Sequence, residues 1–98
     1  MSLEKIMTES RRLCILRVLE ADKGYSINDS VMQAAVDQFG HSVSRDQVRG
    51  DFAWLAEQGL VTVEIVATTV HVAKLTGRGA DVANGRATVP GVQRPSPE

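Results

Sequence analysis

The segment around Ser44, Arg45, Gln47 and Arg49 holds the residues best suited to recognise a charged partner. Arg45 and Arg49 are four residues apart, so in a helix they project from the same side. Two guanidinium groups so placed can bracket a phosphate or read guanine, and Gln47 can pair with adenine if its side chain is free. Gly50 lacks a side chain and would permit a close approach of a backbone. These four polar residues are therefore the predicted DNA contacts of a helix entering a major groove.

The charge of the same region supports a competing interpretation. Residues 27–59 hold two basic and five acidic residues, so their net charge is −3. Placing this segment against a polyanion costs Coulomb energy and releases few counterions. Arg45 and Arg49 would then pair with nearby carboxylates on a solvated face. An acidic helix of this kind would instead suit a basic protein partner, and both interpretations stay open.

Basic residues elsewhere in the chain could supply flanking phosphate contacts, particularly in a dimer. They form two groups, Arg11, Arg12 and Arg17 in one and Lys74, Arg78 and Arg86 in the other. Taken singly, each is equally consistent with an ordinary exposed charge. Thr68 and Thr69, with His71, could touch a minor groove or the DNA backbone. The tip of the predicted hairpin has no lysine or arginine to strengthen such a contact.

Catalytic and metal-binding chemistry finds no support in the residue pattern. The two histidines, His41 and His71, have no metal-ligand spacing, and no glycine-rich phosphate loop is present. Cys14 lies in an apolar run typical of inert core, and a solitary cysteine excludes an intramolecular disulfide. We therefore expect no enzymatic activity, no catalytic residue, no metal and no cofactor.

Composition places the chain among small globular domains. Its 98 residues are 43% hydrophobic and 23% charged, with a formal net charge of −1. No apolar run approaches the roughly 20 residues that span a bilayer, and no signal peptide is evident at the start. We therefore expect a cytoplasmic protein without a membrane partner.

The central helix that must position the arginines is well marked. Ser44 and Gln47 form a capping-box pattern, and Val48, Phe52 and Leu55 recur on one face. Gly59 suits the left-handed residue that ends such a helix.

The other elements are predicted around this helix. A first helix runs from about Glu9 to Asp22 with Thr8 as its cap, and a second follows Ser26 as cap and closes at Phe39. Two β-branched runs, Leu60 to Val66 and Val70 to Leu75, indicate a β-hairpin. A further short helix is capped by Thr76 and ends at Asn84 and Gly85.

The first helix and Trp54 raise the question of partners. The apolar face from Leu13 to Leu19 is wider than one core stripe requires, which indicates either a helix packed on several sides or a homodimer interface. Trp54 lies off the apolar face of its helix, which indicates packing against the hairpin or first helix, or a partner contact.

The order of these elements resembles the winged-helix superfamily, including its arsenic-repressor-like group. The closer resemblance is to small winged-helix proteins of Mu-like phages and prophages. It is carried by the segments RRLCILRVLE (residues 11–20), VSRDQVRGDFAWLAEQGLV (43–61), KLTGRGADVANGR (74–86) and VPGVQRPSP (89–97). The resemblance implies a DNA-binding module in phage transcription or in DNA packaging and assembly. The cysteine pair of metal-sensing members is absent here, so their chemistry does not transfer.

The sequence thus predicts an α+β winged helix-turn-helix of three helices, a β-hairpin wing and a short C-terminal helix. The domain covers residues 1–86, and residues 87–98 form an extended or disordered tail rich in proline. The main functional prediction is a homodimeric, non-enzymatic binder of double-stranded DNA in a bacterial host. The alternative is a module that binds a phage protein during assembly or packaging. A ligand-sensing repressor is a third possibility, and it requires a pocket.

Overall fold

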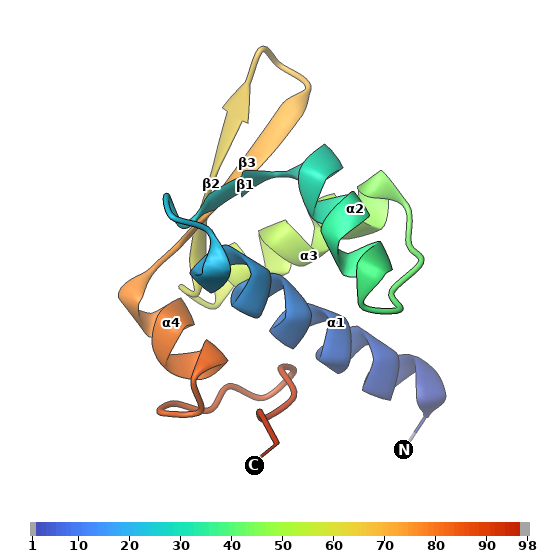
Figure 1. Ribbon diagram of the computed structural model, residues 1–98, viewed down its shortest axis with the longest axis vertical. Helices are drawn as coiled ribbons and strands as arrows, with labels where there is room; N and C mark the ends of the chain where they lie inside the picture. Colours follow the sequence, from blue (N-terminus) through green and yellow to red (C-terminus); the bar gives the residue numbers. More distant parts are fainter. Residues whose placement is uncertain (1, 97–98) are drawn as a thin grey trace.

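The computed structural model describes residues 2–96, and its elements confirm the winged-helix prediction. They are α1 (Leu3–Ala21), β1 (Ser26–Asn28), α2 (Asp29–Gln38), α3 (Arg45–Glu57), β2 (Val61–Val66), β3 (Val70–Leu75) and α4 (Gly77–Ala83). The three strands form an antiparallel sheet in the order β1-β3-β2. The hairpin of β2 and β3 projects beyond the helices as the wing, and α4 lies at the opposite end of the molecule (Figure 1).

Helix α1 begins at Leu3, well before the predicted start at Glu9. Its N-cap is Ser2, whose hydroxyl accepts a hydrogen bond from the amide of Lys5, and Glu4 in the first turn suits the positive end of the helix. Thr8 is an interior residue of the helix, so its predicted role as a cap is wrong. The extra turns of α1 leave Leu3 and Met7 exposed.

The start of α2 also differs from the prediction. Ser26 is no cap, because Ser26–Asn28 forms strand β1 and pairs with β3, Ser26 opposite Lys74. Asn28 caps α2 by accepting a hydrogen bond from the amide of Val31. Pairing with β3 outweighs the local preference of Ser26 for a helix cap. A strand of this length is too short to show the alternating apolar pattern by which strands are recognised in a sequence.

Helix α3 begins and ends as the sequence indicates. The amide of Gln47 donates to the Ser44 hydroxyl over 3.1 Å, and the Ser44 amide donates to the Gln47 side chain over 3.1 Å. Gly59 follows with a φ of +75°, the left-handed conformation that favours glycine. The capping box is therefore formed, and it occupies the Gln47 side-chain oxygen that adenine recognition would need.

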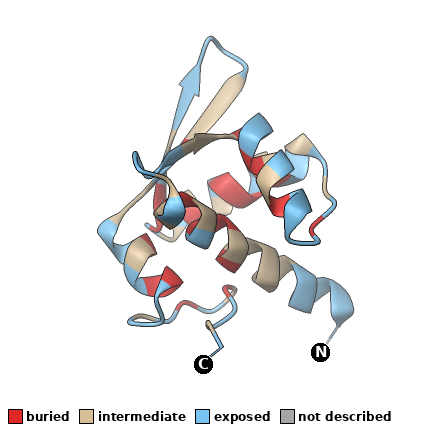
Figure 2. Ribbon diagram, in the orientation of Figure 1, coloured by how far each residue is buried: buried red, intermediate tan, exposed pale blue. Residues whose placement is uncertain are grey.

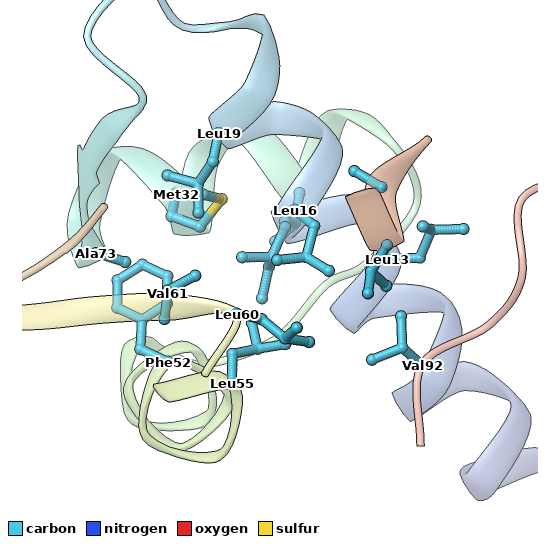
Figure 3. Packing of buried hydrophobic residues seen from close by; sticks show 14 of the residues in the cluster. Leu13, Leu16, Leu19, Met32, Phe52, Leu55, Leu60, Val61, Ala73 and Val92 are labelled. Carbon is cyan, nitrogen blue, oxygen red and sulfur yellow. The ribbon is translucent and has the colours of Figure 1, made fainter. Parts of the chain in front are cut away.

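One apolar core joins the helices to the sheet. Leu16 and Leu19 of α1 meet Phe52 of α3 and Leu60 beside β2, and Val92 packs next to Leu13 at the edge of the cluster (Figure 3). Residues 87–96 contain no helix or strand, yet they fold back on α1, where the amide of Gln93 donates to the carbonyl of Glu9. The last two residues of the predicted tail, 97 and 98, lie outside the described residues.

Candidate nucleic-acid interface

A buried carboxylate organises the corner where α2, α3 and the wing meet. Asp29, the first residue of α2, is fully buried. Its Oδ1 accepts from Nη2 of Arg45 over 3.1 Å, and its Oδ2 accepts from Nε of Arg49 over 2.6 Å. The amide of His71 on β3 adds a third partner at 3.3 Å. We call Asp29, Arg45 and Arg49 the Asp29 cluster.

The Asp29 cluster holds its carboxylate ionised. Burial by itself would raise the pKa of Asp29, because removal from water disfavours the charged form. The hydrogen bonds from Arg49, Arg45 and the amide of His71 outweigh that effect, so the pKa falls well below its usual range. The cluster carries two positive charges against one negative.

Arg49 also ties α3 to the wing. Its Nη2 donates to the backbone carbonyl of Thr69, and its Nη1 lies 3.9 Å from the exposed carboxylate of Asp46. Arg45 keeps 42% of its side chain exposed and Arg49 keeps 28%. The arginines thus pair with carboxylates, as one interpretation of the sequence held, but the main partner is a buried residue on another helix. Part of each arginine side chain still faces solvent.

The outward face of α3 is poor in positive charge. Its exposed residues after the cap are Asp46, Gly50, Ala53 and Glu57, with Gln47 beside them. The basic residues of α3 itself are Arg45 and Arg49, and Arg78 of α4 lies at its C-terminal end, where its Nε donates to the carbonyl of Gln58. The predicted residues Ser44, Arg45, Gln47 and Arg49 therefore lie together at the N-terminal end of α3, next to acidic neighbours.

Arg11 and Arg12 do not join that surface. Arg11 is 12% exposed and forms a two-point ion pair with Asp51, at 2.5 Å from Nε to Oδ2 and 3.1 Å from Nη2 to Oδ1. Arg12 stacks over the ring of Trp54 at 3.8 Å and donates to the carbonyl of Gly91. Both arginines therefore serve internal packing, between α1 and α3 and between α1 and the C-terminal segment, and this geometry does not favour phosphate contacts from them.

The wing places its predicted contacts apart from one another. Thr68 and Thr69 are exposed at the tip, where Ala67 and Thr68 adopt positive φ values of 52° and 62° without glycine. Lys74 is exposed near the base of the wing, between Thr62 and Ser26 on the neighbouring strands. Only Thr69 is linked to the arginines of α3.

The residues that sequence reasoning missed are the buried acids. In the sequence, Asp29 and Asp51 count only among the five acidic residues of segment 27–59. Burial of either carboxylate depends on elements remote in the sequence, so no local pattern indicates it.

His41 and Cys14 are at least partly buried. The described residues contain no group of three or more His, Cys, Asp or Glu side chains able to hold a metal ion. His41 is buried near the Ser10 hydroxyl, and desolvation lowers the pKa of its imidazole. Burial likewise raises the pKa of the Cys14 thiol, which disfavours the nucleophilic thiolate. Across residues 2–96, no helix has the length and apolar character to cross a membrane.

Comparison with known proteins finds relatives in a phage and in a bacterium. It is 55% identical over 92 residues to gp26 of Escherichia phage Mu, and the match covers 94% of each chain. It is 42% identical over 78 residues to a protein of Haemophilus influenzae, covering 80% of this chain and 76% of that one. No model of a known protein family matches the sequence.

A solved structure supports the fold. The hsRosR-S4 complex, whose RosR chain has a winged-helix fold, matches with a TM-score of 0.64 and 19% sequence identity. The match covers 74% of this chain and 62% of the RosR chain. At this level of identity the likeness establishes the winged-helix fold.

Proposed function

We propose that this chain, which belongs to the family of the phage Mu protein gp26, binds double-stranded DNA through α3 and the wing. The observation that carries the proposal is the Asp29 cluster. It fixes two arginine side chains in the N-terminal part of α3 and ties one of them, Arg49, to the wing. These are the two elements with which a winged helix approaches a duplex.

The cluster would act by pre-organisation. Asp29 holds the guanidinium of Arg45 while 42% of that side chain stays exposed, so little side-chain entropy is lost when a phosphate arrives. The amides of Arg45 and Asp46 at the first turn of α3, with the positive end of its dipole, favour the same anion. Thr68 and Thr69 at the tip would meet the adjacent backbone. The mechanism is non-covalent and needs no enzyme chemistry and no cofactor.

The phage relatives and the winged fold support a role in phage transcription or DNA processing, in the cytoplasm of the bacterial host. Acting as a homodimer, the protein would place two copies of α3 on half-sites whose spacing the dimer sets.

Salt-dependent binding to random-sequence duplex DNA, followed by fluorescence anisotropy, tests the proposal. Loss of one phosphate contact lowers the slope of log K against log salt by about 0.9. We expect that loss for Arg45→Ala. Arg86→Ala is the matched control. It removes the same charge from Arg86, which follows α4 and forms an exposed ion pair with Asp81, and it should leave the slope unchanged.

A gain-of-contact pair avoids any ambiguity from a weakened fold. Thr68→Lys adds a cation at the exposed wing tip and should steepen the slope by about 0.9 if the tip meets phosphate. Thr88→Lys adds the same charge to the exposed C-terminal segment and is the matched control. No binding by the unmodified protein at low salt, or equal slopes for all four variants, would overturn the proposal.

A second candidate function is favoured by the outward face of α3. Asp46 and Glu57 flank the small residues Gly50 and Ala53 there, a surface better suited to a basic protein than to DNA. On this alternative the chain is a phage assembly or packaging module. It would bind its partner protein with an affinity that falls on Glu57→Lys, whereas the same change would strengthen DNA binding by the proposed surface.

A further inference from the structure

The outward face of α1 repeats at the spacing of a helix that packs on another helix. Its members are separated by four, three, four, three and four residues: Leu3, Met7, Ser10, Cys14, Arg17 and Ala21. They lie opposite Ile15, Leu16 and Leu19, which face the core. Among the described residues this face has no helix packed along it.

The two halves of this face differ in their surroundings. The C-terminal half forms the floor of a half-open cavity of about 570 Å³. Ala35 and Phe39 at the end of α2 form one wall, and Gln93 and Arg94 of the C-terminal segment form the other. Phe39 is 68% exposed, so the apolar wall lacks a cover.

The N-terminal half of α1 has no such walls. Its first residues, 3–7, project from the body of the protein (Figure 1), and each of them is exposed (Figure 2). Three large apolar side chains nevertheless lie there, Leu3, Ile6 and Met7, with Leu3 73% exposed. The chain thus carries a projecting apolar helix end and, further along the same helix, a walled apolar groove.

We propose that the occupant of this groove is the projecting end of α1 from a second copy of the chain, paired antiparallel. The register follows from the sequence. A two-fold axis at the level of residue 12 places Leu3 opposite Ala21, Met7 opposite Arg17 and Ser10 opposite Cys14, and the residue numbers of each pair add to 24. Because one axis relates all three pairs, the face is complementary to itself, as a two-fold interface requires.

The chemistry of the facing residues suits this arrangement. Leu3 and Met7 of each copy enter the groove beside Val18 and Phe39 of the other. Apolar surface of both copies is thereby removed from water, which favours association. The aliphatic stem of Arg17 can cover Met7 while its guanidinium stays at the rim. No like charges face each other in the three pairs.

A small amphipathic ligand fits the observations less well. It could fill the cavity beside Arg17 and Arg94, but it would leave the projecting end of α1 uncovered. A second copy covers both apolar surfaces in one contact.

This inference deepens the homodimer of the proposed function by naming its surface, and its tests contain no DNA. Failure of the pairing would leave DNA binding by a monomer possible, and failure of DNA binding would leave the pairing intact.

Sedimentation equilibrium of the full chain at micromolar concentration provides the first test. We expect a dimer whose dissociation constant rises at least about tenfold in Met7→Glu, because the new charge would be buried without a partner. Val31→Glu is the matched control, since Val31 is also exposed but lies on α2 away from the groove. It should leave the dimer unchanged.

Disulfide trapping tests the register. Under mild oxidation, Ser10→Cys should form dimers through the introduced thiol of one copy and Cys14 of the other, and reductant should release them. The two thiols of one chain cannot join, because Cβ atoms four residues apart on a helix are about 5–6 Å from each other, beyond the reach of a disulfide. Ser30→Cys, an exposed position on α2, is the control and should not cross-link at the same rate.

Two results would overturn the proposal. One is a wild-type chain that stays monomeric up to about 100 μM, well above the micromolar affinities of specific association. The other is a dimer that survives Met7→Glu and gives no faster cross-linking for Ser10→Cys than for Ser30→Cys, which would place the interface elsewhere.

Discussion

The corner around Asp29 and the outward face of α1 differ in how far their side chains are paired within the chain. At the corner, two arginines pair with one buried carboxylate and join α2, α3 and the wing. Along α1, large apolar side chains remain exposed and a walled groove stays open. The first region uses its charge to hold the fold together, which limits what remains for an anionic partner. The second leaves apolar surface uncovered, which is where association is expected.

The largest predicted loss in the free energy of unfolding comes from removing the carboxylate that Arg45 and Arg49 share. Asp29→Ala breaks both arginine pairs and leaves the His71 amide without its acceptor, so we expect a loss of about 3–5 kcal/mol in the free energy of unfolding. Urea denaturation measures it. Asp46→Ala, which removes an exposed acid 3.9 Å from Arg49, should change stability by less than about 0.5 kcal/mol. A loss of similar size in both variants would contradict the role given to Asp29.

Two arginines on α1 allow paired and exposed charges to be compared within one helix. Arg11 pairs with the nearly buried Asp51, whereas Arg17 lies on the exposed outward face. Arg11→Ala leaves a buried charge unpaired and should cost about 2–3 kcal/mol. Arg17→Ala should cost less than about 0.5 kcal/mol in a dilute, monomeric sample, because surface changes rarely cost more. Equal losses in thermal or urea unfolding would show that the two faces of α1 do not differ as described.

Acid should remove the stability that the ionised Asp29 contributes to the corner. The pKa of Asp29 in the folded protein lies below the value of about 3.9 for an unfolded aspartate. Its charge therefore contributes stability that is fully present above that unfolded value and is lost as the pH falls below it. We expect the urea midpoint to fall more steeply below about pH 4 in the wild type than in Asp29→Asn. The titration of His41 is common to both proteins, so parallel curves would refute the assignment.

The smallest predicted effect concerns the exposed face of α3. Gly50 is helical and a Cβ atom there would meet no other atom within 4 Å. Gly50→Ala should therefore raise stability by about 0.5–1 kcal/mol, since alanine loses less backbone entropy in a helix. Gly79→Ala is a contrasting control, because its Cβ would lie 2.0 Å from the carbonyl oxygen of Leu60 and must destabilise α4. Stabilisation of both or of neither would contradict the packing described.

Local signals in the sequence are enough for the elements that depend on neighbouring residues. Ser44 and Gln47 fix the start of α3, Gly59 its end, and Thr76 the cap of α4, because each acts within four residues along the chain. Strand β1 could not be found in this way, since it exists through its pairing with Ala73 and its neighbours.

The site was foreseeable only in part. The spacing of Arg45 and Arg49 predicts that they share one side of α3, and they do share Asp29. That this partner would be buried on another helix, or that Arg12 would stack on Trp54 beneath the C-terminal segment, depends on tertiary packing. Sequence spacing alone therefore locates the basic residues without showing which of them remain free.

The most direct test of the central claim is an amide chemical-shift titration of the full chain with duplex DNA. We expect the shifts to cluster at residues 44–50 and 67–71, the N-terminal end of α3 and the wing tip. Salt should reverse them as phosphate contacts are displaced. Absence of shifts at low salt, or shifts confined to α1 and α4, would contradict binding through α3 and the wing.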